Sequence, residues 1–119
     1  MTMRTVPKEA LLRLLEQQPA GRVPARCLAA VREDQRERFP TGATSARSLR
    51  ESMELKLASA RRAGRPIEGG DELLLRLQEL GDASIQVFGF EGEHNAIAIY
   101  ASIAHQELAG CLVIERASH

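Results

Sequence analysis

The last third of the chain limits the fold most, because its apolar residues alternate with the period of two that β-strands produce. The pattern predicts three strands, one starting at Ser84, one spanning Asn95 to Ile103 and one spanning Leu108 to Glu115. Glu91-Gly92 is typical of a hairpin turn, and a second turn is expected at His105-Gln106. The three strands are therefore expected to form an antiparallel β-meander.

Both faces of this predicted sheet are apolar. A turn at His105-Gln106 places Tyr100 opposite Cys111 and sorts the side chains onto two faces. One face carries Ile97, Ile99, Ile103, Gly110, Leu112 and Ile114. The other, which we name the small-residue face, carries Ala96, Ala98, Tyr100, Ala109, Cys111 and Val113. An antiparallel sheet with one side in water alternates apolar with polar residues, so this sheet is expected to be covered on both sides.

The sequence leaves two interpretations of what covers the sheet. Helices of the same chain supply it in one interpretation, and a second copy of the chain in a two-fold dimer supplies it in the other.

Four helices are predicted before the strands, and proline or glycine residues end them. Their expected spans are Pro7 to Gln18, Pro24 to Val31, a long helix up to Arg62, and Asp71 to Leu80. Thr44 and Ser48 compete as the N-cap of the long helix. Before it, Arg32 to Arg38 is expected to be a solvated helix end or an exposed turn, and Thr41 to Ser45 a loop. The last helix is expected to pack on more than one side, because its leucines extend beyond one face: Leu73, Leu74, Leu75, Leu77 and Leu80.

These elements predict an α+β fold, with about four N-terminal helices followed by a three-stranded antiparallel β-meander. A chain of 119 residues has room for one hydrophobic core, so a single domain over residues 1–119 is expected. The longest apolar stretch, Ala96 to Ala101, is far shorter than the ~20 residues that a membrane-spanning helix needs. The first residues lack the apolar segment of a signal peptide, and a cytoplasmic protein is expected.

No motif predicts catalysis, a cofactor or a metal, so neither catalytic residues nor a cofactor are expected. Cys27 and Cys111 lie far apart without a C-x-x-C or zinc spacing, and both are interpreted as buried thiols. His94 follows Glu91 and Glu93, which are interpreted as solvated turn charges. His105 cannot share a metal with His94, because the strand between them separates the two turns by roughly 30 Å.

Charge is divided unequally along the chain. Residues 1–66 hold 14 Lys and Arg against seven Asp and Glu, a net +7, and residues 67–119 hold two against nine, a net −7. The two halves can neutralise each other across their interface, or the basic half can face nucleic acid. Leu11 to Val31, two short helices ahead of a longer one and a late hairpin, resembles the opening of winged-helix DNA-binding domains, which implies a DNA contact. The longer third helix, the extra helix before the sheet and the acidic hairpin at Glu91 and Glu93 depart from that family.

The leading hypothesis is a non-enzymatic protein-interaction or regulatory module. It homodimerises, or docks a protein partner, through the small-residue face or through an exposed sheet edge. The first alternative is a DNA-associated regulator that uses Arg22, Arg26, Arg47, Arg50, Arg61 and Arg62. The second alternative is a small-ligand-binding domain with a pocket between helices and sheet.

Overall fold

The computed structural model describes residues 6–32, 36–38, 43–92 and 95–115. Within these ranges the elements follow the order α1 (Val6–Glu16), α2 (Ala25–Arg32), β1 (Arg36–Arg38), β2 (Ala43–Ser45), α3 (Ala46–Arg62), α4 (Gly70–Leu80), β3 (Ser84–Glu91), β4 (Asn95–Ser102) and β5 (Glu107–Glu115). The α+β class and the four predicted helices are confirmed. Within the described ranges, no helix combines the length and the apolar character needed to cross a membrane.

The sheet is antiparallel and larger than predicted. Its order is β1-β3-β4-β5, and β2 also pairs with β3. β1 lies opposite Gly89 to Glu91 and β2 opposite Ser84 to Gln86, so the two short strands share the side of β3 that faces away from β4. The prediction of three strands was therefore incomplete. Strands of three residues are too short to show a period, and pairing with the distant β3 defines them.

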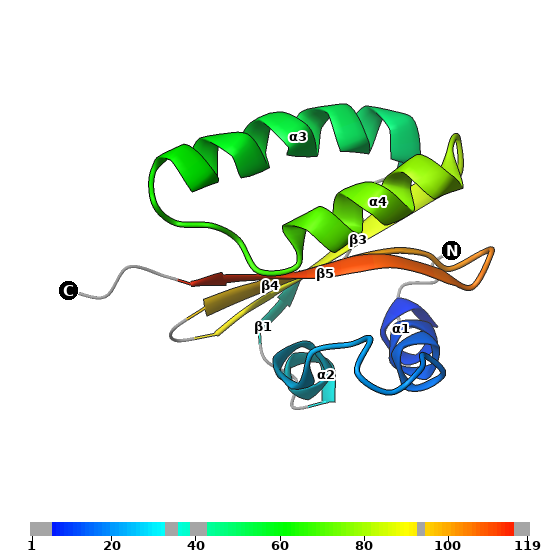
Figure 1. The fold of residues 1–119 in the computed structure, drawn as a ribbon. Helices are drawn as coiled ribbons and strands as arrows, with labels where there is room; N and C mark the ends of the chain where they lie inside the picture. Colours follow the sequence, from blue (N-terminus) through cyan, green and yellow to red (C-terminus); the bar gives the residue numbers. More distant parts are fainter. Residues whose placement is uncertain (1–5, 33–35, 39–42, 93–94, 116–119) are drawn as a thin grey trace.

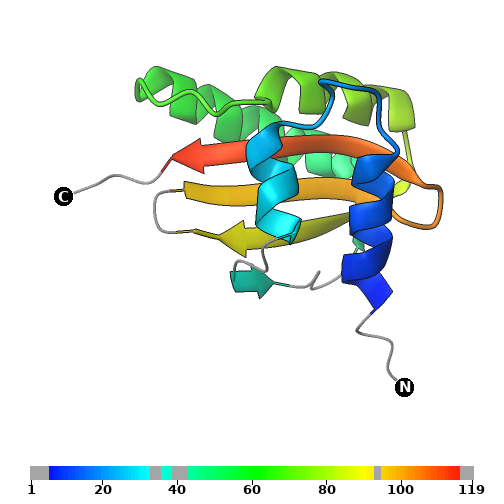
Figure 2. The ribbon, with the colours of Figure 1, turned by 90° about the horizontal axis from the view of Figure 1, so that it is seen from below.

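The sheet lies between two helical layers. Figure 1 shows α3 and α4 on one side of the sheet and α1 and α2 on the other, and Figure 2 shows α1 and α2 crossing the strands on their side. The apolar core accordingly has two parts. The first joins α1 and α2 to the sheet through residues that include Leu11, Cys27, Val31, Phe88, Ile97 and Ile99. The second joins α3 and α4 to the sheet through residues that include Met53, Leu57, Leu73, Leu77, Tyr100 and Leu112. Both faces are covered by the chain's own helices.

The register of the last hairpin differs from the predicted one. Tyr100 lies opposite Gly110, and Ala101 lies opposite Leu108, so Ala109 is an extra residue in β5. The placement of Tyr100 opposite Cys111 was therefore wrong by one residue. The loop from Ser102 to Glu107 holds four residues instead of two, and the extra residue forms a β-bulge. No regular alternation in the sequence reveals such a bulge.

This shift moves side chains of β5 to the other face. Cys111 and Val113 pack with Ile97 against α1 and α2, whereas Ala109 and Leu112 face α3 and α4. The predicted assignment of Cys111 and Val113 to the small-residue face, and of Gly110 and Leu112 to the opposite one, was wrong.

Local signals explain where α3 begins and where α4 ends. Ser45 caps α3, and its side-chain oxygen accepts a hydrogen bond of 3.1 Å from the backbone N–H of Ser48. The predicted N-caps, Thr44 and Ser48, were both wrong, because the N-cap is Ser45. α4 ends at Gly81, whose φ of 60° lies in the left-handed region that glycine tolerates.

Candidate functional site

One edge of the sheet is open. β5 pairs with β4 on one side, and within the described residues its other side makes only a single bridge, in which the N–H of Val113 donates to the carbonyl of Glu68 over 3.3 Å. Next to this bridge, Leu108 to Cys111 line a groove of about 400 Å³. The segment Arg22 to Pro24 contributes to the lining from the side of α1 and α2. Leu108, Ala109 and Cys111 are buried and Gly110 is half-buried, so this part of β5 forms the floor of a depression between elements from both helical layers.

α4 forms the other wall of the groove. Leu73 and Leu77 of α4 are fully buried against the sheet. Gly110 allows this close approach, because a Cβ at its position would lie 3.0 Å from the Cβ of Leu73. Leu75, which lies between these two leucines in the chain, is 63% exposed and lines the groove. The prediction that α4 packs on more than one side is thus wrong for Leu75.

Gly69 closes one end of the groove. Its φ is +90°, and a Cβ at this position would overlap the backbone carbonyl oxygen of Cys111. Only glycine meets both conditions, a left-handed backbone and contact with a neighbouring strand. The chain leading into α4 therefore lies directly against β5 at this end.

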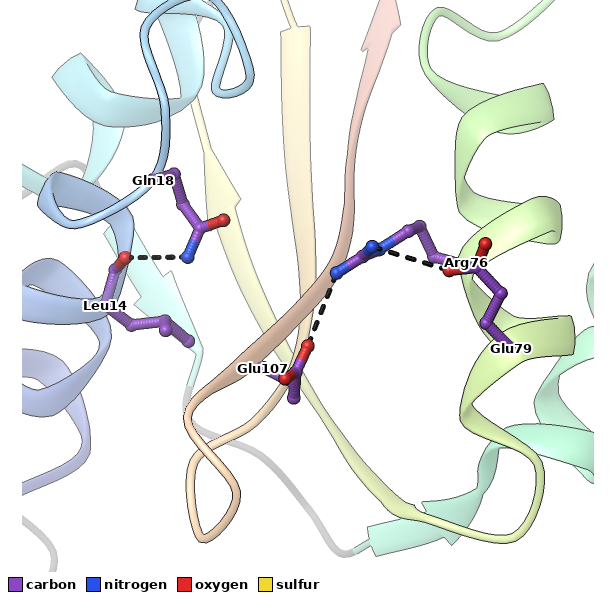
Figure 3. Close-up of polar contacts among 5 residues, drawn as sticks. All are labelled: Leu14, Gln18, Arg76, Glu79 and Glu107. Carbon is purple, nitrogen blue, oxygen red and sulfur yellow. Dashed lines mark hydrogen bonds and ion pairs between the residues drawn. The ribbon is translucent and has the colours of Figure 1, made fainter.

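At the other end of the groove, Arg76 joins α4 to the start of β5. Its guanidinium donates to Glu79, one turn along α4, over 3.4 Å and to Glu107, at the start of β5, over 3.3 Å. Figure 3 shows Arg76 extending from α4 toward Glu107. The same view shows Gln18 donating to the carbonyl of Leu14 at the end of α1, on the far side of β5.

The charges along the groove are unbalanced. Three lining residues carry carboxylates, Glu68, Glu72 and Glu79, and two carry guanidinium groups, Arg22 and Arg76. Arg76 is already bound to Glu79 and to Glu107 outside the groove lining. Among the described residues, neither Glu68 nor Glu72 forms an ion pair. The groove thus offers two carboxylates without an ion pair, Glu68 and Glu72, against one guanidinium without an ion pair, Arg22, and Glu68 also lies within reach of the charge of Arg26.

The two cysteines meet under this groove. Cys111 lines it and is 6% exposed, and Cys27 of α2 is fully buried in the same core cluster. Their thiols interact, which lowers the pKa of Cys27, and this interaction together with burial raises the pKa of Cys111. The predicted burial of both thiols is confirmed, and their place in one core cluster could not be predicted, because it depends on strand register and helix packing.

A second pair of chemically interesting side chains lies in the last hairpin loop. Ser102 Oγ lies 3.0 Å from His105 Nδ1, beside a hollow that Arg76 and Glu107 also line. A nucleophilic serine needs an accessible hydroxyl and a histidine oriented by a third group. Ser102 is 2% exposed, and no described residue is bonded to the other histidine nitrogen. The hydrogen bond between residues three apart acts to close the loop.

The residues predicted as an interface lie inside the molecule. Four of them, Tyr100, Ala109, Cys111 and Val113, are buried, and Ala96 and Ala98 are half-buried. They are divided between the two faces of the sheet. The face on which Ala98, Tyr100 and Ala109 lie is covered by α3 and α4, so a second copy cannot reach it without displacing them.

The arginines proposed for nucleic acid do not form one surface. Arg22 and Arg26 lie on the side of α1 and α2, whereas Arg47, Arg50, Arg61 and Arg62 belong to α3 on the opposite side of the sheet. Three of them pair with acidic residues of the second half of the chain: Arg26 with Glu115 at 2.6 Å, Arg47 with Asp82 at 3.4 Å and Arg61 with Asp71 at 3.2 Å. The unequal charge of the two halves is thus partly neutralised within the fold.

Within the described residues, no group of three or more His, Cys, Asp and Glu side chains is placed to hold a metal ion. His94, considered above with Glu91, lies outside these ranges. Comparison with known proteins gives no matching family model, no matching curated protein and no matching solved structure.

Proposed function

We propose that this chain is a protein-interaction module that binds an extended segment of a partner protein as an added strand along β5. The observation that carries the proposal is the open edge at Leu108 to Cys111, which lies in a groove beside α4. An edge strand offers unpaired backbone N–H and C=O groups, and an extended peptide satisfies them by pairing with the strand.

The size of the groove fits a short segment. The four residues from Leu108 to Cys111 span roughly 13 Å at ~3.3 Å per residue, enough to pair with about four residues of a partner. The bridge between Glu68 and Val113 limits the pairing at one end. Leu75, 63% exposed above the strand, gives an apolar contact for a side chain of the bound segment.

The free carboxylates favour a particular occupant. A lysine or arginine in the bound segment pairs with Glu68 or Glu72, which have no ion-pair partner among the described residues. A second copy of this chain, docked edge to edge about a two-fold axis, brings an identical surface and thus the same carboxylates toward the groove. Arg22 of each copy offsets one of its two carboxylates, and the net negative charge that remains on both grooves disfavours that pairing, so the occupant is a basic, extended segment of a different protein.

Anisotropy of fluorescein-labelled peptides tests this proposal. Three octapeptides that alternate valine with lysine, threonine or glutamate serve as probes, and the lysine peptide is expected to bind most tightly. Leu75→Lys removes the apolar contact and adds a like charge, so it should weaken binding of the lysine peptide by roughly tenfold or more. Leu55→Lys is the matched control, because Leu55 is 76% exposed on α3, away from the groove, and should leave binding unchanged.

A second pair of variants tests the charges. Glu72→Gln should weaken binding of the lysine peptide and leave the threonine peptide unaffected, and Glu54→Gln on α3 is its control. Failure of all three peptides to bind, or equal effects of Leu75→Lys and Leu55→Lys, would overturn the proposal. A dimer in light scattering that Leu75→Lys dissociates would show that a second copy occupies the groove instead.

A further inference from the structure

The groove along β5 is closed by backbone at one end. Glu68 forms its antiparallel bridge with Val113 there, and Gly69 lies against the carbonyl of Cys111. The protein's own chain thus occupies the place beside β5 that a bound segment needs in order to continue past Cys111. A segment that pairs with β5 therefore has to end, or turn away, at this closed end.

The opposite end is closed only by side chains. Arg76 reaches from α4 to Glu107 over 3.3 Å, and the two side chains are 29% and 46% exposed (Figure 3). A partly exposed ion pair adds little stability and can be displaced. Beyond it lies the hollow of about 320 Å³ beside Ser102 and His105, which shares Arg76 and Glu79 with the groove. A bound segment can therefore continue past this end.

The unpaired carboxylates of the groove lie at the closed end. Glu68 forms the bridge there, and Glu72 belongs to the first turn of α4, which begins directly after Gly69. Neither carboxylate forms an ion pair among the described residues, whereas the two carboxylates at the opposite end are bound to Arg76. Arg22 on the other wall offsets one of the two charges. One negative charge is left for a ligand.

The backbone of β5 offers a further acceptor at the closed end. The N–H of Val113 donates to Glu68, on the side of β5 that faces away from β4. In an antiparallel strand the N–H and C=O groups of every second residue point to the same side, so those of Cys111 also face the open edge. Among the described residues, no N–H outside the β4–β5 pairing donates to the Cys111 carbonyl.

We propose that the bound segment is the free N-terminus of a partner protein, and that Glu72, Glu68 and the carbonyl of Cys111 hold its α-ammonium group at the closed end. An ammonium group has three donors and a positive charge, which suit these three acceptors. A C-terminal carboxylate meets like charge at the same place. This inference rests on the proposed binding of a segment along β5.

The same geometry gives the segment a direction. With its first residue at the closed end, the segment runs from Cys111 toward Leu108, antiparallel to β5. This is the orientation that Glu68 already has in its bridge with Val113. The rest of the partner chain then leaves the groove past Arg76.

Peptides with altered ends test the inference. An octapeptide that alternates valine with lysine carries fluorescein at its C-terminal end, and its N-terminus is free, acetylated or extended by two glycines. Acetylation removes the charge, and the added glycines shift it away from the carboxylates. Each change should weaken binding roughly tenfold or more in anisotropy titrations at neutral pH. Two glycines placed before the fluorescein should leave binding unchanged, because that end lies outside the groove.

Glu72→Gln is the variant that tests the carboxylate, since the charge of Arg26 already acts on Glu68. This variant should bind the free and the acetylated peptide with nearly equal affinity. Glu54→Gln is the matched control, because Glu54 is an exposed carboxylate of α3, and it should keep the full difference between the two peptides.

Two outcomes would overturn the inference and leave the proposed function in place. One is equal binding of the free, acetylated and N-terminally extended peptides to the wild-type chain. The other is a larger loss from glycines at the C-terminal end than at the N-terminal end, which would show the opposite direction of binding. If none of the peptides binds, the proposed function itself fails, and this inference fails with it.

Discussion

The two faces of the sheet differ in how they meet the helices that cover them. On the face covered by α1 and α2, large side chains of the sheet fill the space, such as Phe88, Phe90 and Ile97. On the face covered by α3 and α4, the sheet contributes Ile85, Tyr100 and Leu112 near its ends and centre, but beside them it also has small residues, Ala98, Ala109 and Gly110, and leucines of α4 pack on these.

This difference explains the small residues of the last hairpin. A surface of alanine and glycine is compatible with a second copy of the chain, and it is equally compatible with close packing of a helix. Here it seats α4, because Leu73 lies against Gly110. The edge of β5 beside α4 is the part of the sheet at which we propose that a partner binds, and the following substitutions test the contrast between the two faces.

The largest effect is expected for Phe88→Ala on the face of α1 and α2. Phe88 is 2% exposed and is among the largest fully buried side chains, so the substitution should lower the free energy of unfolding by about 3–5 kcal/mol. Val87→Ala is the matched control, because Val87 is the preceding residue, half-buried and packed on the opposite face. Urea denaturation measures both. Equal losses for the two variants would contradict the contrast between the faces.

A smaller loss is expected for Gly110→Ala on the other face. The new Cβ would lie 3.0 Å from both Cβ and Cδ1 of Leu73, and this overpacking should cost about 1–3 kcal/mol. In a Leu73→Ala background the cost should decrease because Cδ1 is gone, without vanishing because the Cβ of residue 73 remains. A double-mutant cycle from urea denaturation measures this coupling. No loss in the single variant would show that α4 is not seated on Gly110.

The smallest effect at neutral pH is expected for Tyr100→Phe. Among the described residues, the Tyr100 hydroxyl donates only to the Met53 thioether, 3.9 Å away and a weak acceptor, so stability should change by less than about 1 kcal/mol. Burial raises the pKa of Tyr100 above its ordinary value of 10.0, so the unfolded chain loses this proton first. The stability held below pH 10.0 is therefore lost as the pH rises past that value.

Wild type should thus lose more stability than Tyr100→Phe between pH values below and above 10.0, as measured by urea denaturation at each pH. Parallel losses in the two proteins would show that Tyr100 ionises alike in the folded and unfolded states.

Much of the architecture was predictable from local signals. Pro19, Gly64 and Gly81 mark helix ends, and the alternation after Ser84 marks the strands. The apolar character of both faces correctly predicted a sheet covered on both sides. β1 and β2 were missed because three residues are too few to show an alternation of apolar and polar side chains. The register of the last hairpin was missed because the bulge at Ala109 leaves no mark in the sequence pattern.

The groove was beyond sequence reasoning for a different reason. Its lining comes from four separate segments: 22–24, 68–69, 72–79 and 108–111. One signal was present, since the leucines of α4 extend beyond the face that contacts the sheet. Leu75 is the member of that set left exposed along the groove, and an excess apolar residue on a helix next to an edge strand was the available indication.

The junction at Ser45 has a consequence for how this molecule tolerates change. Ser45 ends β2, caps α3 and pairs with Ser84 at the start of β3. The N–H of Ala46 also donates to the carbonyl of Ala83 over 2.9 Å, so both ends of the α3–α4 hairpin are pinned at one place. A segment whose ends already touch can be lengthened or shortened at little entropic expense. Insertions or deletions in the α3–α4 segment can thus change this wall of the groove while β2, β3 and β4 keep their pairing.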